Sequence, residues 1–119
     1  MNIHHLAIRV KNLEESLKFY QNVAGLQVME RFTEGPAELA YMADHEGASE
    51  IELICIPDGE TASASGMFIC FGTDDLEAVH KIATEENRNP SPIREPSPTA
   101  KYFYVYDPDG LSVQFREYK

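Results

Sequence analysis

Three polar side chains lie in segments of the sequence that predict β-strands, at positions expected to face away from the core. His5, Glu52 and Gln114 each alternate with apolar neighbours, and this alternation places them opposite the apolar side chains of their strands. An imidazole nitrogen, a carboxylate and an amide oxygen together suit a divalent cation of hard to borderline character. The spacing alone is not specific, because a lone strand histidine and a distant glutamate more commonly form a solvated pair.

The two halves of the chain predict the same order of elements, namely a strand, a helix and three strands. In the first half the helix begins after the capping residue Asn12 and ends at Gly25. In the second half Asp74 or Asp75 caps the helix. The expected strands are 3–10, 26–33, 38–44 and 49–56, then 67–73, one short edge strand at most in the proline-rich segment 87–99, 102–106 and 111–117.

The halves also match weakly as sequences. An Asn-Leu-Glu segment at the start of the first helix corresponds to an Asp-Leu-Glu segment at the start of the second. At this offset of 63 residues His5 falls on Phe68, and the last strands of the two halves match at an offset of 62, which places Glu52 on Gln114. A repeat folded about a pseudo-twofold axis would bring these four positions together in one cleft. The repeat therefore favours a shared site over a set of unrelated surface residues.

Three segments of the chain resemble the vicinal oxygen chelate superfamily. They are IHHLAIRVKNLEESLKFYQNVAGLQV (3–28), Ile51-Glu52-Leu53, and YVYDPDGLSVQF (104–115). That superfamily includes glyoxalase I, extradiol dioxygenases, methylmalonyl-CoA epimerase, fosfomycin-modifying enzymes and bleomycin-resistance proteins. The resemblance implies an α+β fold in which two tandem βαβββ modules form a curved mixed sheet around a cleft. We expect one domain, with modules at 1–56 and 66–119 joined by a linker at 57–65.

The resemblance also implies a set of metal ligands that this chain keeps only in part. The first-strand histidine matches His5, and the fourth-strand glutamate matches Glu52. The histidine of the second module falls on Phe68, or on Met67 after a one-residue shift, and strand alternation favours Phe68. The last glutamate position holds Gln114, whose amide cannot act as a base. The implied metal set is therefore His5, Glu52 and Gln114, and Glu52 could either bind the metal or act as the catalytic base.

Further residues are candidates for contact with substrate. Arg9 shares a strand face with His5, and Arg116 shares one with Gln114, so either guanidinium could orient an anionic group. Phe68 and Tyr104 would supply aromatic walls to the cleft. His4 neighbours His5 but is expected to point to the opposite face of the strand.

Two functions from different classes follow from these residues. The first is a glyoxalase I-like lyase or isomerase, resembling lactoylglutathione lyase, which acts on a small oxygen-rich substrate with a divalent metal (Ni, Zn, Fe or Mn). The alternative is a metal-free small-molecule binding protein of the bleomycin-resistance type. The broken ligand set and the acidic composition favour the alternative, whereas the repeat-equivalent placement of His5 and Glu52 favours the enzyme.

The composition narrows the range of partners. The formal net charge of −10 argues against nucleic acid and anionic membrane surfaces, which require clustered Lys and Arg. The chain has two cysteines and no apolar run long enough to span a bilayer, so we expect a cytoplasmic protein with free thiols in its core. The family resemblance further implies a homodimer.

Overall fold

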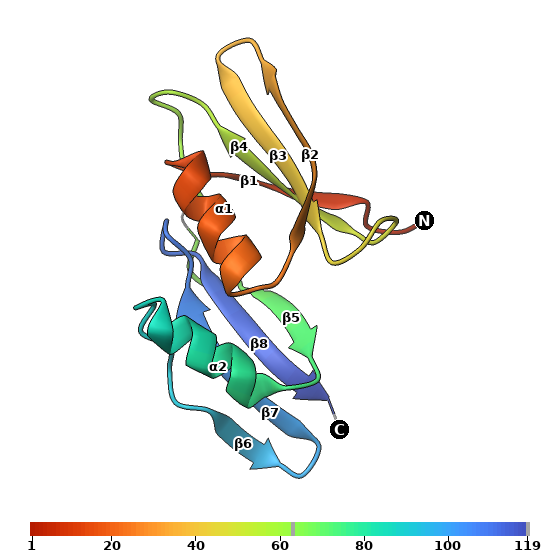
Figure 1. Ribbon diagram of the computed structural model, residues 1–119, viewed down its shortest axis with the longest axis vertical. Helices are drawn as coiled ribbons and strands as arrows, with labels where there is room; N and C mark the ends of the chain where they lie inside the picture. Colours follow the sequence, from red (N-terminus) through yellow and green to blue (C-terminus); the bar gives the residue numbers. More distant parts are fainter. Residues whose placement is uncertain (63, 119) are drawn as a thin grey trace. The chain divides into compact units, whose positions relative to one another are not determined.

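The computed structural model describes residues 1–62 and 64–118, with only the backbone described for Tyr118 (Figure 1). The chain divides into two compact units, unit 1 (Met1–Ala62) and unit 2 (Ser63–Lys119). Each unit contains one helix and one four-stranded mixed sheet, as the sequence predicts.

Unit 1 has the predicted βαβββ order. Its strands pair in the order β1-β4-β3-β2, with β1 parallel to β4 and the other pairs antiparallel. The elements are β1 (His5–Arg9), α1 (Leu13–Asn22), β2 (Gln27–Glu34), β3 (Ala37–Ala43) and β4 (Glu50–Cys55).

Unit 2 repeats this topology. Its strands pair in the order β5-β8-β7-β6, again with the first and last strands of the module parallel. The elements are β5 (Ile69–Thr73), α2 (Leu76–Glu85), β6 (Arg94–Ser97), β7 (Ala100–Tyr106) and β8 (Ser112–Tyr118). The short β6 lies at the sheet edge, where prolines that cannot donate a backbone hydrogen bond are tolerated.

The register of the sheets confirms the internal repeat residue by residue. In unit 1, Glu52 lies between Ala7 on β1 and Tyr41 on β3. In unit 2, Gln114 lies in the same way between Cys70 on β5 and Tyr104 on β7. The pairing of Glu52 with Gln114 as equivalent positions, inferred from a weak sequence match, is therefore correct.

The helices bury one apolar face each against their own sheets. In α1, Leu17 and Tyr20 are fully or almost fully buried, and the helix packs on β3 and β4. In α2, Leu76 and Ala83 are fully buried, and the helix packs on β7 and β8. The opposite face of each sheet is consequently left for polar side chains such as Glu52.

Local chemistry explains where the helices begin and where the last hairpin turns. The side chain of Asn12 accepts a hydrogen bond from the backbone N–H of Glu15, and α1 ends three residues before Gly25, which has a positive φ of 71°. Asp107, which is buried, accepts hydrogen bonds from the backbone N–H groups of Asp109 and Leu111, each at 2.9 Å. This contact gives Asp107 a turn-forming role.

Two expectations about β5 were wrong. The strand begins at Ile69 rather than at Met67, so Met67 is exposed and does not share the core face. Cys70 is exposed, whereas Cys55 is half-buried, and both are free thiols. Cys70 lies directly opposite Gln114 in the pairing of β5 with β8, so the two side chains share one face of the sheet. No helix in the described ranges is long and apolar enough to cross a bilayer.

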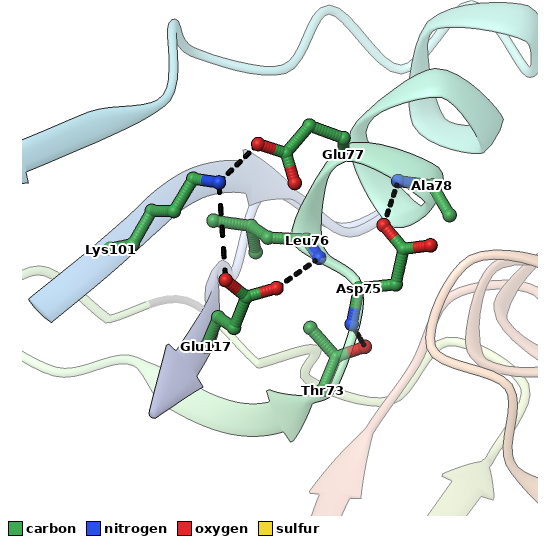
Figure 2. Close-up of polar contacts among 7 residues, drawn as sticks. All are labelled: Thr73, Asp75, Leu76, Glu77, Ala78, Lys101 and Glu117. Carbon is green, nitrogen blue, oxygen red and sulfur yellow. Dashed lines mark hydrogen bonds and ion pairs between the residues drawn. The ribbon is translucent and has the colours of Figure 1, made fainter. Parts of the chain in front are cut away.

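A cluster of charged side chains ties the start of α2 to β7 and β8 (Figure 2). Lys101 of β7 forms ion pairs with Glu77 of α2 and with Glu117 of β8. The hydrogen bond to Glu77 raises the pKa of Lys101 above its ordinary value. Glu117 also accepts the backbone N–H of Leu76 at 3.1 Å. One of the N–H groups that a helix start leaves without an intrahelical partner is thereby satisfied.

The same region decides between the two predicted caps of α2. The side chain of Asp75 accepts the backbone N–H of Ala78 at 3.1 Å, so Asp75 is the cap and Asp74 precedes it (Figure 2). We predict that Asp75→Ala lowers the free energy of unfolding in urea by about 1 kcal/mol, the typical value of an N-cap. Asp74→Ala is the matched control, because it removes the same charge from an exposed neighbour. An equal or larger loss in Asp74→Ala would contradict the assignment.

Candidate functional site

His5 and Glu52 lie close together in unit 1 although 46 residues separate them in sequence. The Nε2 atom of His5 is 3.7 Å from the Oε1 atom of Glu52. Parallel pairing of β1 with β4 places Ala7 directly opposite Glu52, and His5 lies one same-face position before Ala7. Because Ala7 carries only a methyl group, the imidazole can reach across to the carboxylate. His5 and Glu52 thus meet within unit 1, whereas the predicted cleft that would also hold Phe68 and Gln114 stays a prediction.

The two groups differ in their exposure to solvent. The Glu52 side chain, on the inner strand β4, is 10% exposed, whereas the His5 side chain, on the edge strand β1, is 35% exposed. The Glu52 carboxylate is therefore largely shielded from solvent, whereas the His5 imidazole is accessible to a ligand in solution. Arg9, at the end of β1, is also exposed.

Tyr41 is a member of this site that the sequence interpretation missed. It is the cross-strand partner of Glu52, and its hydroxyl donates a hydrogen bond to the Glu52 carboxylate. Its ring also meets the His5 ring edge-on, with 5.5 Å between centroids. A possible signal was the equivalence of Tyr41 and Tyr104 in the repeat, but a tyrosine in a strand is not by itself distinctive.

The hydrogen bond to Glu52 raises the pKa of the Tyr41 phenol above its ordinary value. Partial burial and the negative charges of nearby carboxylates, Glu52 foremost, raise it further. Tyr41 therefore remains a protonated hydrogen-bond donor at neutral pH.

His4 departs from the predicted strand alternation. Its Nδ1 atom is 2.8 Å from the Nδ1 atom of His5, and the two rings meet edge-on. β1 begins at His5, so His4 is outside the strand and the alternation does not fix its direction. The expectation that it points to the opposite face is wrong.

Unit 2 contains the equivalent arrangement with different chemistry. Gln114 is 4% exposed, and its Nε2 atom donates a hydrogen bond to the Tyr104 hydroxyl at 2.9 Å. The Phe68 ring meets the Tyr104 ring edge-on at 5.4 Å, much as His5 meets Tyr41. This ring contact, which matches that of His5 with Tyr41, supports Phe68 as the counterpart of His5.

An aromatic cluster extends this part of unit 2. Tyr102 contacts Tyr104 edge-on at 5.8 Å, and the guanidinium carbon of Arg116 lies 5.8 Å from the centre of the Tyr102 ring. Arg116 therefore lies over an aromatic face, where cation–π attraction favours it. Phe68, Tyr104 and Arg116, three of the predicted substrate-binding residues, belong to one cluster in unit 2. The convergence of this cluster with His5 and Glu52 in one cleft stays a prediction.

The distance between His5 and Glu52 is compatible with a shared metal ion. Two ligand atoms that each bind a metal at about 2.1 Å can be at most about 4.2 Å apart, and the observed 3.7 Å is within this limit. Within the described part of the chain, no three His, Cys, Asp or Glu side chains form a group that could hold a metal ion. The pair therefore fits as two ligands, and a complete set would require an amide oxygen or water as well.

Comparisons with known proteins extend over the whole chain. The family model for the Glyoxalase/Bleomycin resistance protein/Dioxygenase superfamily matches residues 2–115. A Haemophilus influenzae protein named lactoylglutathione lyase is 35% identical over 100% of this chain and 94% of its own length. A Neisseria meningitidis protein of the same name is 32% identical, covering 100% and 92%. The structure of a glyoxylase/bleomycin resistance protein/dioxygenase domain from Frankia sp. EAN1pec superposes with a TM-score of 0.82 at 16% identity, covering 100% and 98%.

The contact between Tyr41 and Glu52 predicts a specific alkaline titration. Because the folded-state pKa of Tyr41 is raised, the stabilisation from this contact is present below pH about 10 and is lost as the pH rises through the raised value. We predict that Glu52→Gln lowers the pKa of Tyr41, measured by tyrosinate absorption with Tyr41→Phe identifying the signal. Glu50→Gln, a matched control on the same strand, should have a smaller effect. Coincident titrations of Glu52→Gln and the unmodified protein would contradict this account.

Proposed function

Because the chain belongs to the Glyoxalase/Bleomycin resistance protein/Dioxygenase superfamily, we propose that it is a glyoxalase I-like lyase or isomerase that acts on a small oxygen-rich substrate with a divalent metal. The observation that carries the proposal is the 3.7 Å approach of His5 Nε2 to Glu52 Oε1. The lactoylglutathione lyase relatives at 35% and 32% identity support this class of substrate. The homodimer that the resemblance implies stays a prediction.

His5 and Glu52 would hold the metal, and the amide oxygen of Gln114 would assist. Carboxylate, imidazole and amide oxygen form a donor set suited to a hard or borderline divalent ion. When bound, such an ion supplies Lewis-acid polarisation of a substrate oxygen. Gln114 is a weaker donor than the glutamate that the family pattern implies at this position, because its amide is neutral.

Movement of a proton falls to Glu52. Of the two repeat-equivalent positions, Glu52 carries a group that can accept and release a proton, whereas the amide of Gln114 cannot. Glu52 is buried and hydrogen-bonded by Tyr41, so its carboxylate is held in place while the exposed His5 edge remains open to a ligand. Phe68 adds an apolar wall where the family pattern implies a second imidazole.

A second candidate function is metal-free binding of a small molecule. Unit 2 contains a half-open cavity of about 340 Å³, at the lower end of the volumes typical of ligand pockets. It is lined by Asn89, Ser91, Tyr104, Val105, Tyr106 and Ser112. An aromatic lining in an acidic chain suits a cationic aromatic ligand. Thermal stabilisation by such a ligand and not by any divalent metal would favour this function.

The proposal predicts that the metal-free protein binds one divalent ion and that this binding requires His5. Titration calorimetry with Ni²⁺ or Zn²⁺ should give a saturable isotherm, and His5→Ala should weaken it at least ~10-fold because a direct ligand is lost. His45→Ala is the control, since His45 lies in an exposed turn beside Asp44. The metal-dependent function would be rejected by an isotherm that never saturates, or by equal affinity in His5→Ala.

Restoring the missing carboxylate should strengthen the site. We predict that Gln114→Glu raises metal affinity at least ~10-fold and increases lactoylglutathione lyase activity, because a charged carboxylate replaces a neutral amide. Tyr104 can donate to the new carboxylate as Tyr41 donates to Glu52. Gln21→Glu, on the exposed side of α1, controls for the change in net charge. No gain over this control would count against Gln114 as part of the site.

A further inference from the structure

Two tyrosines at equivalent positions of the repeat hold the two equivalent oxygen-bearing side chains. Tyr41 is the cross-strand neighbour of Glu52, and Tyr104 is the cross-strand neighbour of Gln114. The Tyr41 hydroxyl donates to the Glu52 carboxylate, whereas the Tyr104 hydroxyl accepts the Nε2 proton of Gln114 at 2.9 Å. Both units therefore have a tyrosine at this repeat position, although it contacts a glutamate in unit 1 and a glutamine in unit 2.

The hydrogen bond between Gln114 and Tyr104 affects the direction of the Gln114 amide oxygen, which is a potential metal ligand. The amide uses its nitrogen to donate to Tyr104, so its oxygen is directed away from the tyrosine. A carboxylate has two oxygens, so a hydroxyl that donates to one of them leaves the other available to a ligand. In unit 2 the hydrogen bond to Tyr104 thus sets the direction in which the Gln114 amide oxygen points.

In unit 1 the same tyrosine also restrains the imidazole. The Tyr41 ring lies edge-on to His5 at 5.5 Å and is itself stacked on Phe32 at 6.1 Å. Phe32 lies on β2 and Tyr41 on the adjacent β3, so the ring is supported from the side remote from His5. Tyr41 consequently contacts both members of the pair that the proposed function uses.

We propose that Tyr41 is a positioning residue that holds the Glu52 carboxylate in the orientation that faces His5. The inference rests on the proposed function, because its consequence is a metal site arranged before the ion binds. A carboxylate without this hydrogen bond would have to be ordered by the ion itself, and that ordering would reduce affinity. Loss of such an outer hydrogen bond typically weakens metal binding about 10- to 100-fold.

The test measures Zn²⁺ affinity by titration calorimetry in the full chain, with stability followed by urea unfolding. Tyr41→Phe keeps the ring and removes the hydroxyl, and it should weaken Zn²⁺ binding about 10- to 100-fold. Tyr102→Phe is the matched control, because it removes a hydroxyl from the aromatic cluster without touching Glu52 or Gln114, and it should leave the affinity unchanged. In a Glu52→Ala background, Tyr41→Phe should have no further effect on affinity.

The measured Zn²⁺ affinities distinguish failure of the positioning role of Tyr41 from failure of the proposed metal-dependent function. Normal Zn²⁺ affinity in Tyr41→Phe, with or without a loss of stability, would overturn the positioning role and leave the metal site intact. An equal loss of affinity with and without Glu52 would also overturn it, because Tyr41 would then act through another group. Failure of the unmodified protein to bind Zn²⁺ would overturn both the inference and the metal-dependent function.

Discussion

Parallel pairing of the first and last strands of each module is the constraint on which the candidate site depends. In unit 1 it places β1 beside β4 and so brings His5 within 3.7 Å of Glu52 across 46 intervening residues. A register shift of one residue would turn Glu52 toward the helix-covered face and separate the two groups. The small side chain of Ala7 opposite Glu52 is part of the same constraint, because a larger residue there would block the imidazole.

Duplication of this strand arrangement explains why the two units place side chains in the same way although the side chains themselves differ. Each unit places a tyrosine beside the central polar residue and an aromatic or imidazole ring against that tyrosine. At these positions unit 1 has the titratable residues His5 and Glu52, whereas unit 2 has Phe68 and Gln114. The backbone pairing is thus independent of whether a module contributes ligands or an aromatic wall. The same strand arrangement is compatible with either a metal-dependent enzyme or a binding protein.

The sequence predicts the features that local patterns determine. Strand alternation and helix caps predict both βαβββ modules, and the weak repeat pairs Glu52 with Gln114. The role of Tyr41 is not predictable in this way, because a strand tyrosine that packs and one that donates to a buried carboxylate look alike in sequence. His4 and Met67 were misassigned for a common reason: each precedes its strand, so alternation does not apply. Cys70 was misplaced because its apolar neighbours do not reveal that β5 is an edge strand.

The central claim is that the His5–Glu52 pair binds a divalent metal through one imidazole and one carboxylate. X-ray absorption spectroscopy of the Zn²⁺-loaded protein tests it most directly, because scattering from an imidazole ring is distinct from that of oxygen ligands alone. The account predicts one imidazole in the coordination shell, with oxygen atoms in the remaining positions. A shell of oxygen atoms only would contradict it, and so would a shell with two imidazoles, which would place the ion at the adjacent His4 and His5 rings instead.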